Sequence, residues 1–172
     1  MGLVGLTCIS VMAGCIQSGE KKVHEPSIVT PVVQSVASGP RHVCAILEGG
    51  QVQCWGANDH RQLGHDAMPV ANAPRPVVGL PPMVEVSVGA QHSCARTADG
   101  DLYCWGGRHG LPKRVKALSG VKTLASGGSR TCVVDASGTQ CFRYDRLSLS
   151  MMSIGGMEDV VALQFLLEHP ED

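Results

Sequence analysis

The chain has 172 residues and a formal net charge of −1, a length that suits one domain with a sizeable core. Its 14 Lys and Arg residues are balanced by 15 Asp and Glu residues and form no basic stripe, which argues against nucleic-acid binding through phosphates. Glycine (21) and proline (10) are abundant, as turn-rich β structure requires. Eight cysteines in a chain of this size indicate an exported, oxidised protein.

Residues 1–15 have the character of an export signal. The stretch from Gly2 to Ile16 is apolar or small, carries no charge and is shorter than the about 20 residues that span a bilayer. It contains Met12-Ala13-Gly14-Cys15, which resembles the lipobox of bacterial lipoproteins. The resemblance implies that the signal is cut before Cys15 and that this cysteine carries the lipid. An ordinary signal peptide or a buried apolar strand is the alternative.

A sequence motif that occurs in three copies occupies the middle of the chain. Each copy opens with two apolar residues three positions apart and a glycine three positions further on, as in Val33/Val36/Gly39, Met83/Val86/Gly89 and Val121/Leu124/Gly127. Repeats with a period of roughly 20–50 residues are typical of stacked supersecondary units. We therefore expect a polar tether over residues 16–31, repeats over 32–142, and a degenerate fourth repeat or tail over 143–172.

The first two copies continue with alternating stretches that flank a three-residue loop ending in glycine, which predicts β-hairpins. Folding the chain about these loops places pairs of cysteines opposite each other. Directly opposed Cα atoms of antiparallel strands lie about 4.5–5.5 Å apart, a range that overlaps disulfide geometry. The predicted pairs are Cys44/Cys54, Cys94/Cys104 and Cys132/Cys141, the last on a loop of different length. Trp55 and Trp105, which end the two hairpins, are expected in the core.

This repeated motif resembles the repeats of the regulator of chromosome condensation family, in the cysteine-rich form seen in exported bacterial proteins. The matching residues are Gly39, His42, Cys44, Cys54-Trp55-Gly56, Asn58 and Gln62-Leu63-Gly64, then Gly89, His92, Cys94 and Cys104-Trp105-Gly106. The family fold is a β-propeller of about seven four-stranded blades. The resemblance implies an all-β, partial β-propeller of about three blade-like antiparallel repeats, with hairpins stapled by disulfides.

The sequence departs from the family pattern at several places. Arg61 stands where the family usually has glycine, the second copy lacks the Asn…Gln-Leu-Gly segment, and the third copy reads Cys141-Phe142-Arg143. About three blades leave two unpaired sheet edges, which invite pairing with another chain. Three interpretations stay open: a truncated or decaying gene product, closure by self-association, or docking on a partner.

Two sets of residues invite a metal interpretation. His42 and His92 each stand two positions before a cysteine of a predicted pair, so each set supplies three zinc ligands. No fourth ligand recurs and Arg130 replaces the histidine in the third copy, which favours disulfides with a turn-stabilising histidine. The turn Asp99-Gly100-Asp101 has too few oxygens for calcium. We therefore expect no metal and no cofactor.

The candidate binding residues lie in the longest connector, residues 57–73. They form a polar cluster, His60, Arg61, His65 and Asp66. Loops on a rigid frame often carry recognition, and a solvated connector is the alternative. The isolated carboxylates Glu85 and Asp135 are expected to be solvated.

The repeats favour binding over catalysis, because the sequence shows no nucleophile elbow, P-loop or recurring acid/base pair. We expect a non-catalytic protein-binding module of the bacterial cell envelope, exported and membrane-anchored as a lipoprotein that faces the periplasm or the cell surface. The expected partners are a protein and the membrane lipid, not nucleic acid, and a homo-oligomer that closes the arc stays open. The alternatives are a surface enzyme or enzyme inhibitor with a loop-borne site, and guanine-nucleotide exchange as in the family's namesake.

Overall fold

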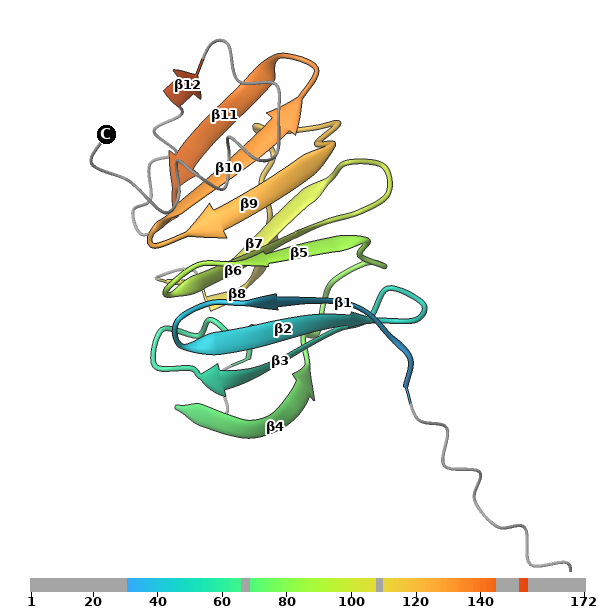
Figure 1. Ribbon diagram of the computed structural model, residues 1–172, viewed down its shortest axis with the longest axis vertical. Helices are drawn as coiled ribbons and strands as arrows, with labels where there is room; N and C mark the ends of the chain where they lie inside the picture. Colours follow the sequence, from blue (N-terminus) through green and yellow to red (C-terminus); the bar gives the residue numbers. More distant parts are fainter. Residues whose placement is uncertain (1–30, 66–68, 108–109, 145–151, 155–172) are drawn as a thin grey trace, which may run out of the picture. The chain divides into compact units, whose positions relative to one another are not determined.

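The structure is a computed structural model that describes residues 31–65, 69–107, 110–144 and 152–154 (Figure 1). Its contacts separate Met1–Thr30 from a second unit, Pro31–Asp172, which holds every described strand. The predicted signal, the lipidation site Cys15 and the candidate Asp66 lie outside the described residues. In the part that is described, no helix has the length and apolar character needed to cross a membrane.

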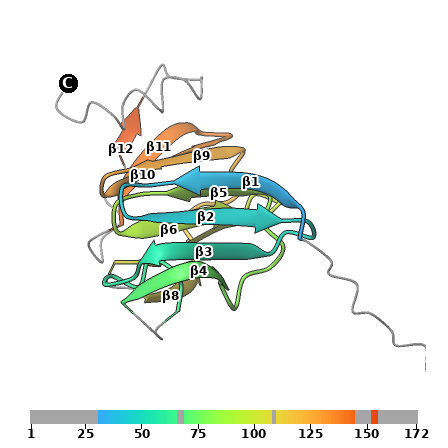
Figure 2. The same ribbon diagram turned by 60° about the horizontal axis from the view of Figure 1, so that its bottom comes forward.

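The described strands form three four-stranded antiparallel sheets, here called blades 1, 2 and 3 (Figures 1 and 2). Blade 1 contains β1 (Val33–Ser38), β2 (His42–Leu47), β3 (Val52–Ala57) and β4 (Val70–Pro76). Blade 2 contains β5 (Glu85–Val88), β6 (His92–Arg96), β7 (Leu102–Gly106) and β8 (Gly110–Arg114). Blade 3 contains β9 (Thr123–Gly127), β10 (Arg130–Asp135), β11 (Gly138–Arg143) and β12 (Met152–Ile154). The sequence did not predict β12, which comes from the segment assigned to the tail.

The hairpins bring the predicted cysteine pairs together. Two cysteines face each other directly across the ladder in β2–β3, in β6–β7 and in β10–β11. Disulfides join Cys44–Cys54, Cys94–Cys104 and Cys132–Cys141, with Cα–Cα distances of 4.1, 4.1 and 4.0 Å. Gly50 and Gly100 end the first two loops with φ of +80° and +81°, the left-handed conformation expected there. The stapled hairpins are therefore confirmed.

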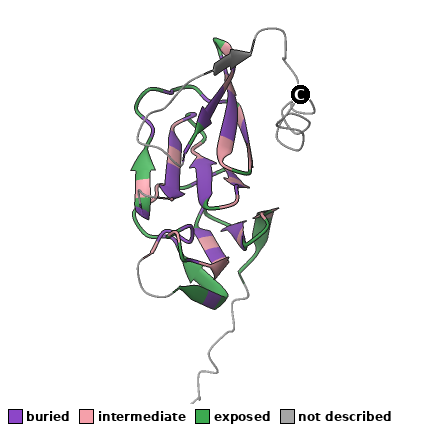
Figure 3. Ribbon diagram, turned by 90° about the vertical axis from the view of Figure 1, so that its left-hand side faces the viewer, coloured by how far each residue is buried: buried purple, intermediate pink, exposed green. Residues whose placement is uncertain are grey.

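Apolar side chains fill the spaces between neighbouring blades. One buried cluster joins blade 1 to blade 2 and includes Ile46, Val52, Leu63, Met83, Val86 and Trp105. A second joins blade 2 to blade 3 and includes Leu102, Leu118, Val121, Leu124, Phe142 and Tyr144. Figure 3 shows this burial within the strands, whereas all of β4 except Ala71 is exposed. Each blade thus has a leading face, toward the preceding blade, and a trailing face, toward the next.

The burial of equivalent residues depends on whether another described blade packs against the face on which they lie. Trp55, Trp105 and Phe142 each follow the second cysteine of their hairpin. Trp105 and Phe142 are buried against blade 1 and blade 2. Trp55 is only half-buried, because it lies on the leading face of blade 1 and no described blade precedes it. The expectation of a core tryptophan is therefore right for Trp105 and wrong for Trp55.

Candidate functional site

The connector between β3 and β4 contains a folded segment, residues 58–65, here called the 58–65 loop. Asn58 organises it: its Oδ1 accepts a hydrogen bond from the Leu63 backbone N at 3.0 Å, and its Nδ2 donates to the His65 carbonyl at 2.9 Å. A short side-chain amide suits this task, because it can replace the backbone groups of a turn. The matched asparagine of the repeat therefore acts as an internal brace.

Gln62 and Leu63 attach the loop to blade 2. The Gln62 side chain is buried, accepts a hydrogen bond from His60 N at 2.8 Å and donates to Asp59 Oδ1 at 3.2 Å. Its backbone carbonyl accepts a hydrogen bond from Ser93 Oγ at 3.0 Å. The Leu63 side chain is fully buried in the cluster between the blades. The loop is therefore fixed from both sides rather than being a solvated connector.

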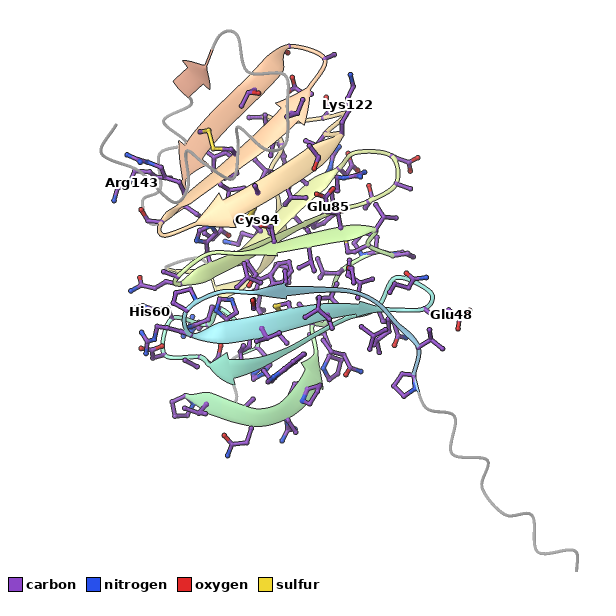
Figure 4. The ribbon with its side chains drawn as sticks, viewed as in Figure 1. Glu48, His60, Glu85, Cys94, Lys122 and Arg143 are labelled. Atoms are coloured by element: carbon purple, nitrogen blue, oxygen red, sulfur yellow. A yellow bond between two sulfur atoms is a disulfide. The ribbon has the colours of Figure 1, made fainter. Side chains whose placement is uncertain are left out.

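The outer rim of this loop carries opposite charges in contact. Arg41 Nη2 lies 2.8 Å from Asp59 Oδ2, and His60 Nε2 lies 3.7 Å from the same oxygen. Slight burial opposes the shift, but the Gln62 hydrogen bond and the Arg41 guanidinium hold the pKa of Asp59 below its ordinary value. His60 lies on the side of the blades on which Arg143 also lies, away from Glu48 and Lys122 (Figure 4). Sequence reasoning missed Arg41 and Asp59, which join His60 at this rim.

Arg61 has an unusual backbone. Its φ is +59°, and it is the only non-glycine residue with a positive φ in the described ranges. This explains the glycine that the family has there, because the left-handed region favours glycine. The Arg61 side chain lies against Gly110 in β8. A Cβ atom added to Gly110 would lie 3.2 Å from both Cδ and Nη1 of Arg61. Strain of this kind persists only where the surroundings hold it, and here the braced loop does so.

His65 does not join the rim. Both of its ring nitrogens are buried and have no hydrogen-bond partner among the described residues. The structure therefore brings His60 together with Arg41 and Asp59, places the Arg61 side chain against β8, and gives the His65 ring no hydrogen bond to the rim.

A histidine–hydroxyl pair links each described blade to the next. His42 Nε2 lies 2.7 Å from Ser93 Oγ, and His92 Nε2 lies 2.7 Å from Thr131 Oγ1. Both histidines are buried. The sequence predicted that these histidines stabilise turns, whereas they bridge blades. The signal was present: the residue after the repeated histidine position is a hydroxyl in copies two and three, Ser93 and Thr131.

The hydrogen bonds fix the tautomer of His42. Ser93 Oγ donates its proton to the Gln62 carbonyl, so it accepts from His42 Nε2–H. Nδ1 is then an unprotonated, buried nitrogen with no donor beside it. Burial, and then the Arg41 charge, lower the pKa of His42 from 6.5 to about 4. His42 is thus a neutral structural imidazole, and its neighbouring cysteines are bound in a disulfide rather than to zinc.

The two carboxylates expected in solvent are hydrogen-bonded instead. Glu85 Oε1 accepts from Thr123 Oγ1 at 2.8 Å and from Leu124 N at 3.2 Å, and Glu85 also pairs with Arg96. Asp135 is buried and accepts from Ser137 N and Gln140 Nε2. The expectation of solvated carboxylates is wrong because Glu85 lies at the contact between blades, and Asp135 closes its own hairpin.

A cavity of about 230 Å³ opens between blades 2 and 3. Gly107, Gly128 and Ser129 line it, together with His92 and Tyr144, whose rings stack at 5.4 Å. Burial raises the pKa of the Tyr144 hydroxyl. The corresponding place between blades 1 and 2 is occupied by the 58–65 loop, which the second copy lacks. The volume is below the roughly 300–1,000 Å³ of most small-molecule sites.

Three blades whose facing surfaces form common cores, in chain order, define a protein of the β-propeller type. Two sequence profiles of the regulator of chromosome condensation (RCC1) repeat match the chain, over residues 49–96 and 33–62. These residues therefore carry RCC1-type repeats, which agrees with the resemblance found in the sequence. No curated protein matches it in sequence.

Several solved structures are similar to this chain in fold. Human WBSCR16 superposes with a TM-score of 0.59 at 21% identity, over 65% of this chain and 33% of that one. Yeast RCC1 (Prp20) bound to Kap60 gives 0.59 at 20% identity, over 65% and 32%. Prp20p from Saccharomyces cerevisiae gives 0.58 at 24% identity, over 72% and 33%. The present chain thus spans about a third of the length of these proteins.

Proposed function

We propose that this protein is a non-catalytic protein-binding module of the bacterial cell envelope, exported and anchored through a lipid on Cys15. It recognises a protein partner through the rim formed by Arg41, Asp59 and His60, with Arg61 next to His60 in the same loop. The observation that carries the proposal is the braced 58–65 loop, which holds both charge signs on a scaffold of blades. A surface ordered before binding loses little entropy on association, which favours specific recognition.

The solved relatives are consistent with binding as the family's use of this fold. Yeast RCC1 (Prp20) is seen bound to Kap60, and Prp20p has binding properties toward Gsp1p and histones. These partners belong to those proteins. We do not carry nucleotide exchange over to this chain, because it spans only about a third of their length and its charge, −1, offers no basic face for chromatin.

Site-specific photo-crosslinking in cells that produce the protein tests this proposal. A photo-reactive residue replaces His60 in one variant and Lys122, on the other side of the blades, in the control (Figure 4). We expect a discrete protein adduct from position 60 that Arg41→Glu reduces at least tenfold, with none from position 122. Equal adducts at both positions, or none at position 60, would overturn the proposal.

A further inference from the structure

The trailing face of blade 3 is buried although no other described blade covers it. It is formed around the Cys132–Cys141 disulfide, with Ala125 and Val134 beside it. The exposed fractions of Ala125, Cys132 and Cys141 are 7%, 1% and 8%. This buried cluster contains residues of blade 3 alone, whereas in blades 1 and 2 the first strand of the next blade, β5 or β9, packs on the equivalent disulfide. Since the apolar face of a sheet is buried by another element, blade 3 needs a cover of the same kind.

The two described connectors that lead from one blade to the next have the same length. Pro76 and Arg114 end β4 and β8, and each pairs with the residue that precedes the second cysteine of its hairpin. The first repeat residue of the next blade, Met83 or Val121, is the seventh residue after them. Each connector is held by two backbone hydrogen bonds to its own hairpin: Val77 N to the Val52 carbonyl and Met83 N to the Gly50 carbonyl, then Val115 N to the Leu102 carbonyl and Val121 N to the Gly100 carbonyl. Seven residues is thus the length with which this chain passes from blade to blade.

The same count after blade 3 leads to Val160. Ser153 in β12 pairs with Gln140, the residue that precedes Cys141, and is therefore the equivalent of the last residues of β4 and β8. Val160 is the seventh residue after Ser153. Residues 155–172 lie outside the described residues, and their sequence alone carries the pattern. The positions that face the preceding blade are all apolar, since Val160, Leu163 and Phe165 correspond to Met83, Val86 and Val88 of blade 2.

The connector itself repeats the apolar pattern. In each of the three passages an apolar residue stands at every third position up to the first strand of the next blade. In the two described passages these residues lie in the buried clusters between blades or pack against them. The three sets are Val77, Leu80, Met83 and Val86; Val115, Leu118, Val121 and Leu124; and Ile154, Met157, Val160 and Leu163. The third set therefore has the residues to fill the same places between blade 3 and a strand that follows it.

Chain reach excludes the register that starts three residues earlier, with Met157 as the first repeat residue. The path runs from the fourth strand of one blade to the first strand of the next. It crosses three strand spacings, about 14 Å, and then about 10 Å between facing sheets, which together make a distance of roughly 17 Å. Four residues from Ser153 to Met157 span at most about 14 Å, whereas seven residues from Ser153 to Val160 span about 24 Å. The longer connector satisfies both the distance and the apolar pattern.

We propose that residues 160–165 form a strand that lies on the trailing face of blade 3, as β5 lies on blade 1 and β9 on blade 2. The side chains of Val160, Leu163 and Phe165 pack against the face that holds the Cys132–Cys141 disulfide. Val161 corresponds to Val84 and Lys122, which are exposed, and lies away from the contact. The cover of this face is therefore a segment of the same chain rather than a second protein. The contact is separate from the 58–65 loop and does not depend on the proposed function.

Photo-crosslinking within the full chain tests the contact. The photo-reactive residue benzoylphenylalanine replaces Leu163 in one variant and Val161 in the control, and peptide mass spectrometry locates the adduct. We expect position 163 to form an adduct within one chain, to a peptide that contains Cys132, Val134 or Cys141, with a yield at least tenfold above that of position 161. Equal yields from the two positions, no adduct from position 163, or an adduct to another part of the chain or to a second molecule would overturn the proposal.

Urea unfolding of two charged variants provides an independent test. Leu163→Glu should lower the urea midpoint because it places an unpaired carboxylate in the contact, whereas Val161→Glu should leave the midpoint unchanged. If Leu163→Glu yields no folded protein, Leu163→Ala and Val161→Ala give the same comparison. Equal midpoints within the pair that is measured would refute the cover. None of these substitutions alters the rim of the 58–65 loop, so the crosslink expected at position 60 is a separate result.

Discussion

Acid should destabilise the blades through His42 before the carboxylates titrate. His42 is buried, its Nε2–H donates to Ser93 and its Nδ1 faces no acceptor for a second proton. A proton on Nδ1 would place an uncompensated charge in the space between blades 1 and 2, near the Arg41 cation. The folded protein therefore resists a protonation that the unfolded chain accepts readily.

The pKa of His42 sets the pH window and the size of this effect. The unfolded chain binds the proton near pH 6.5 and the folded chain only near about 4. The stability that the neutral imidazole contributes is thus complete above about pH 6.5, declines as the pH falls, and is lost below about 4. The difference between these two pKa values corresponds to about 3 kcal/mol in the free energy of unfolding. Protonation of Asp59, whose pKa is lowered in the folded protein, also reduces the free energy of unfolding, but only at pH values below the ordinary carboxylate pKa.

Urea unfolding followed by tryptophan fluorescence between about pH 7 and about pH 5 measures the effect. His42→Gln keeps a side-chain donor for Ser93 but cannot titrate, so its free energy of unfolding should fall less steeply with acid than that of the wild type. His60→Gln, which removes a half-exposed imidazole, is the control and should follow the wild type. Parallel curves for the wild type and His42→Gln would refute the reasoning.

Three further substitutions test the packing. Arg61→Gly should raise the free energy of unfolding by about 1 kcal/mol in urea titrations, because glycine adopts the φ of +59° without strain. The control Arg75→Gly, in exposed β4, should lower the free energy of unfolding. Equal responses of the two variants would contradict the argument. Replacing Cys94 and Cys104 together by alanine should cost about 3 kcal/mol, the value for a loop of this length, and an unchanged urea midpoint would argue against a stapling role. Leu63→Ala should cost about 3 kcal/mol because it leaves a cavity between blades 1 and 2, whereas Val70→Ala at an exposed site should cost little; similar losses would mean that the loop is not packed as described.

The features that the sequence predicted are local ones. The register of a hairpin depends on its own loop, so the glycine that ends each turn determines which cysteines face each other. Candidate loop residues were predicted for the same reason, since polar side chains between two strands must lie in a connector. Within that connector, His60 reaches the rim and His65 does not, because the brace formed by Asn58 turns the chain.

The features that the sequence did not predict depend on contacts between repeats. His42 and Ser93 are 51 residues apart, and nothing within one copy indicates that they meet. Trp55 and Trp105 stand in the same motif yet differ in burial, because only Trp105 has a blade in front of it. Glu85 was expected in solvent for the same reason: its partners Thr123 and Leu124 belong to the next copy.

The departures from the repeat pattern compensate one another across the contacts between blades. The second copy lacks the loop that fills the space between blades 1 and 2, and the third copy has Tyr144 where the second has Gly107. The Tyr144 ring stacks on His92 and narrows the space that the absent loop leaves. The compensation is partial, because a cavity of about 230 Å³ remains beside the stacked rings. Each irregular residue is therefore best interpreted against the blade that faces it, as Tyr144 is against His92.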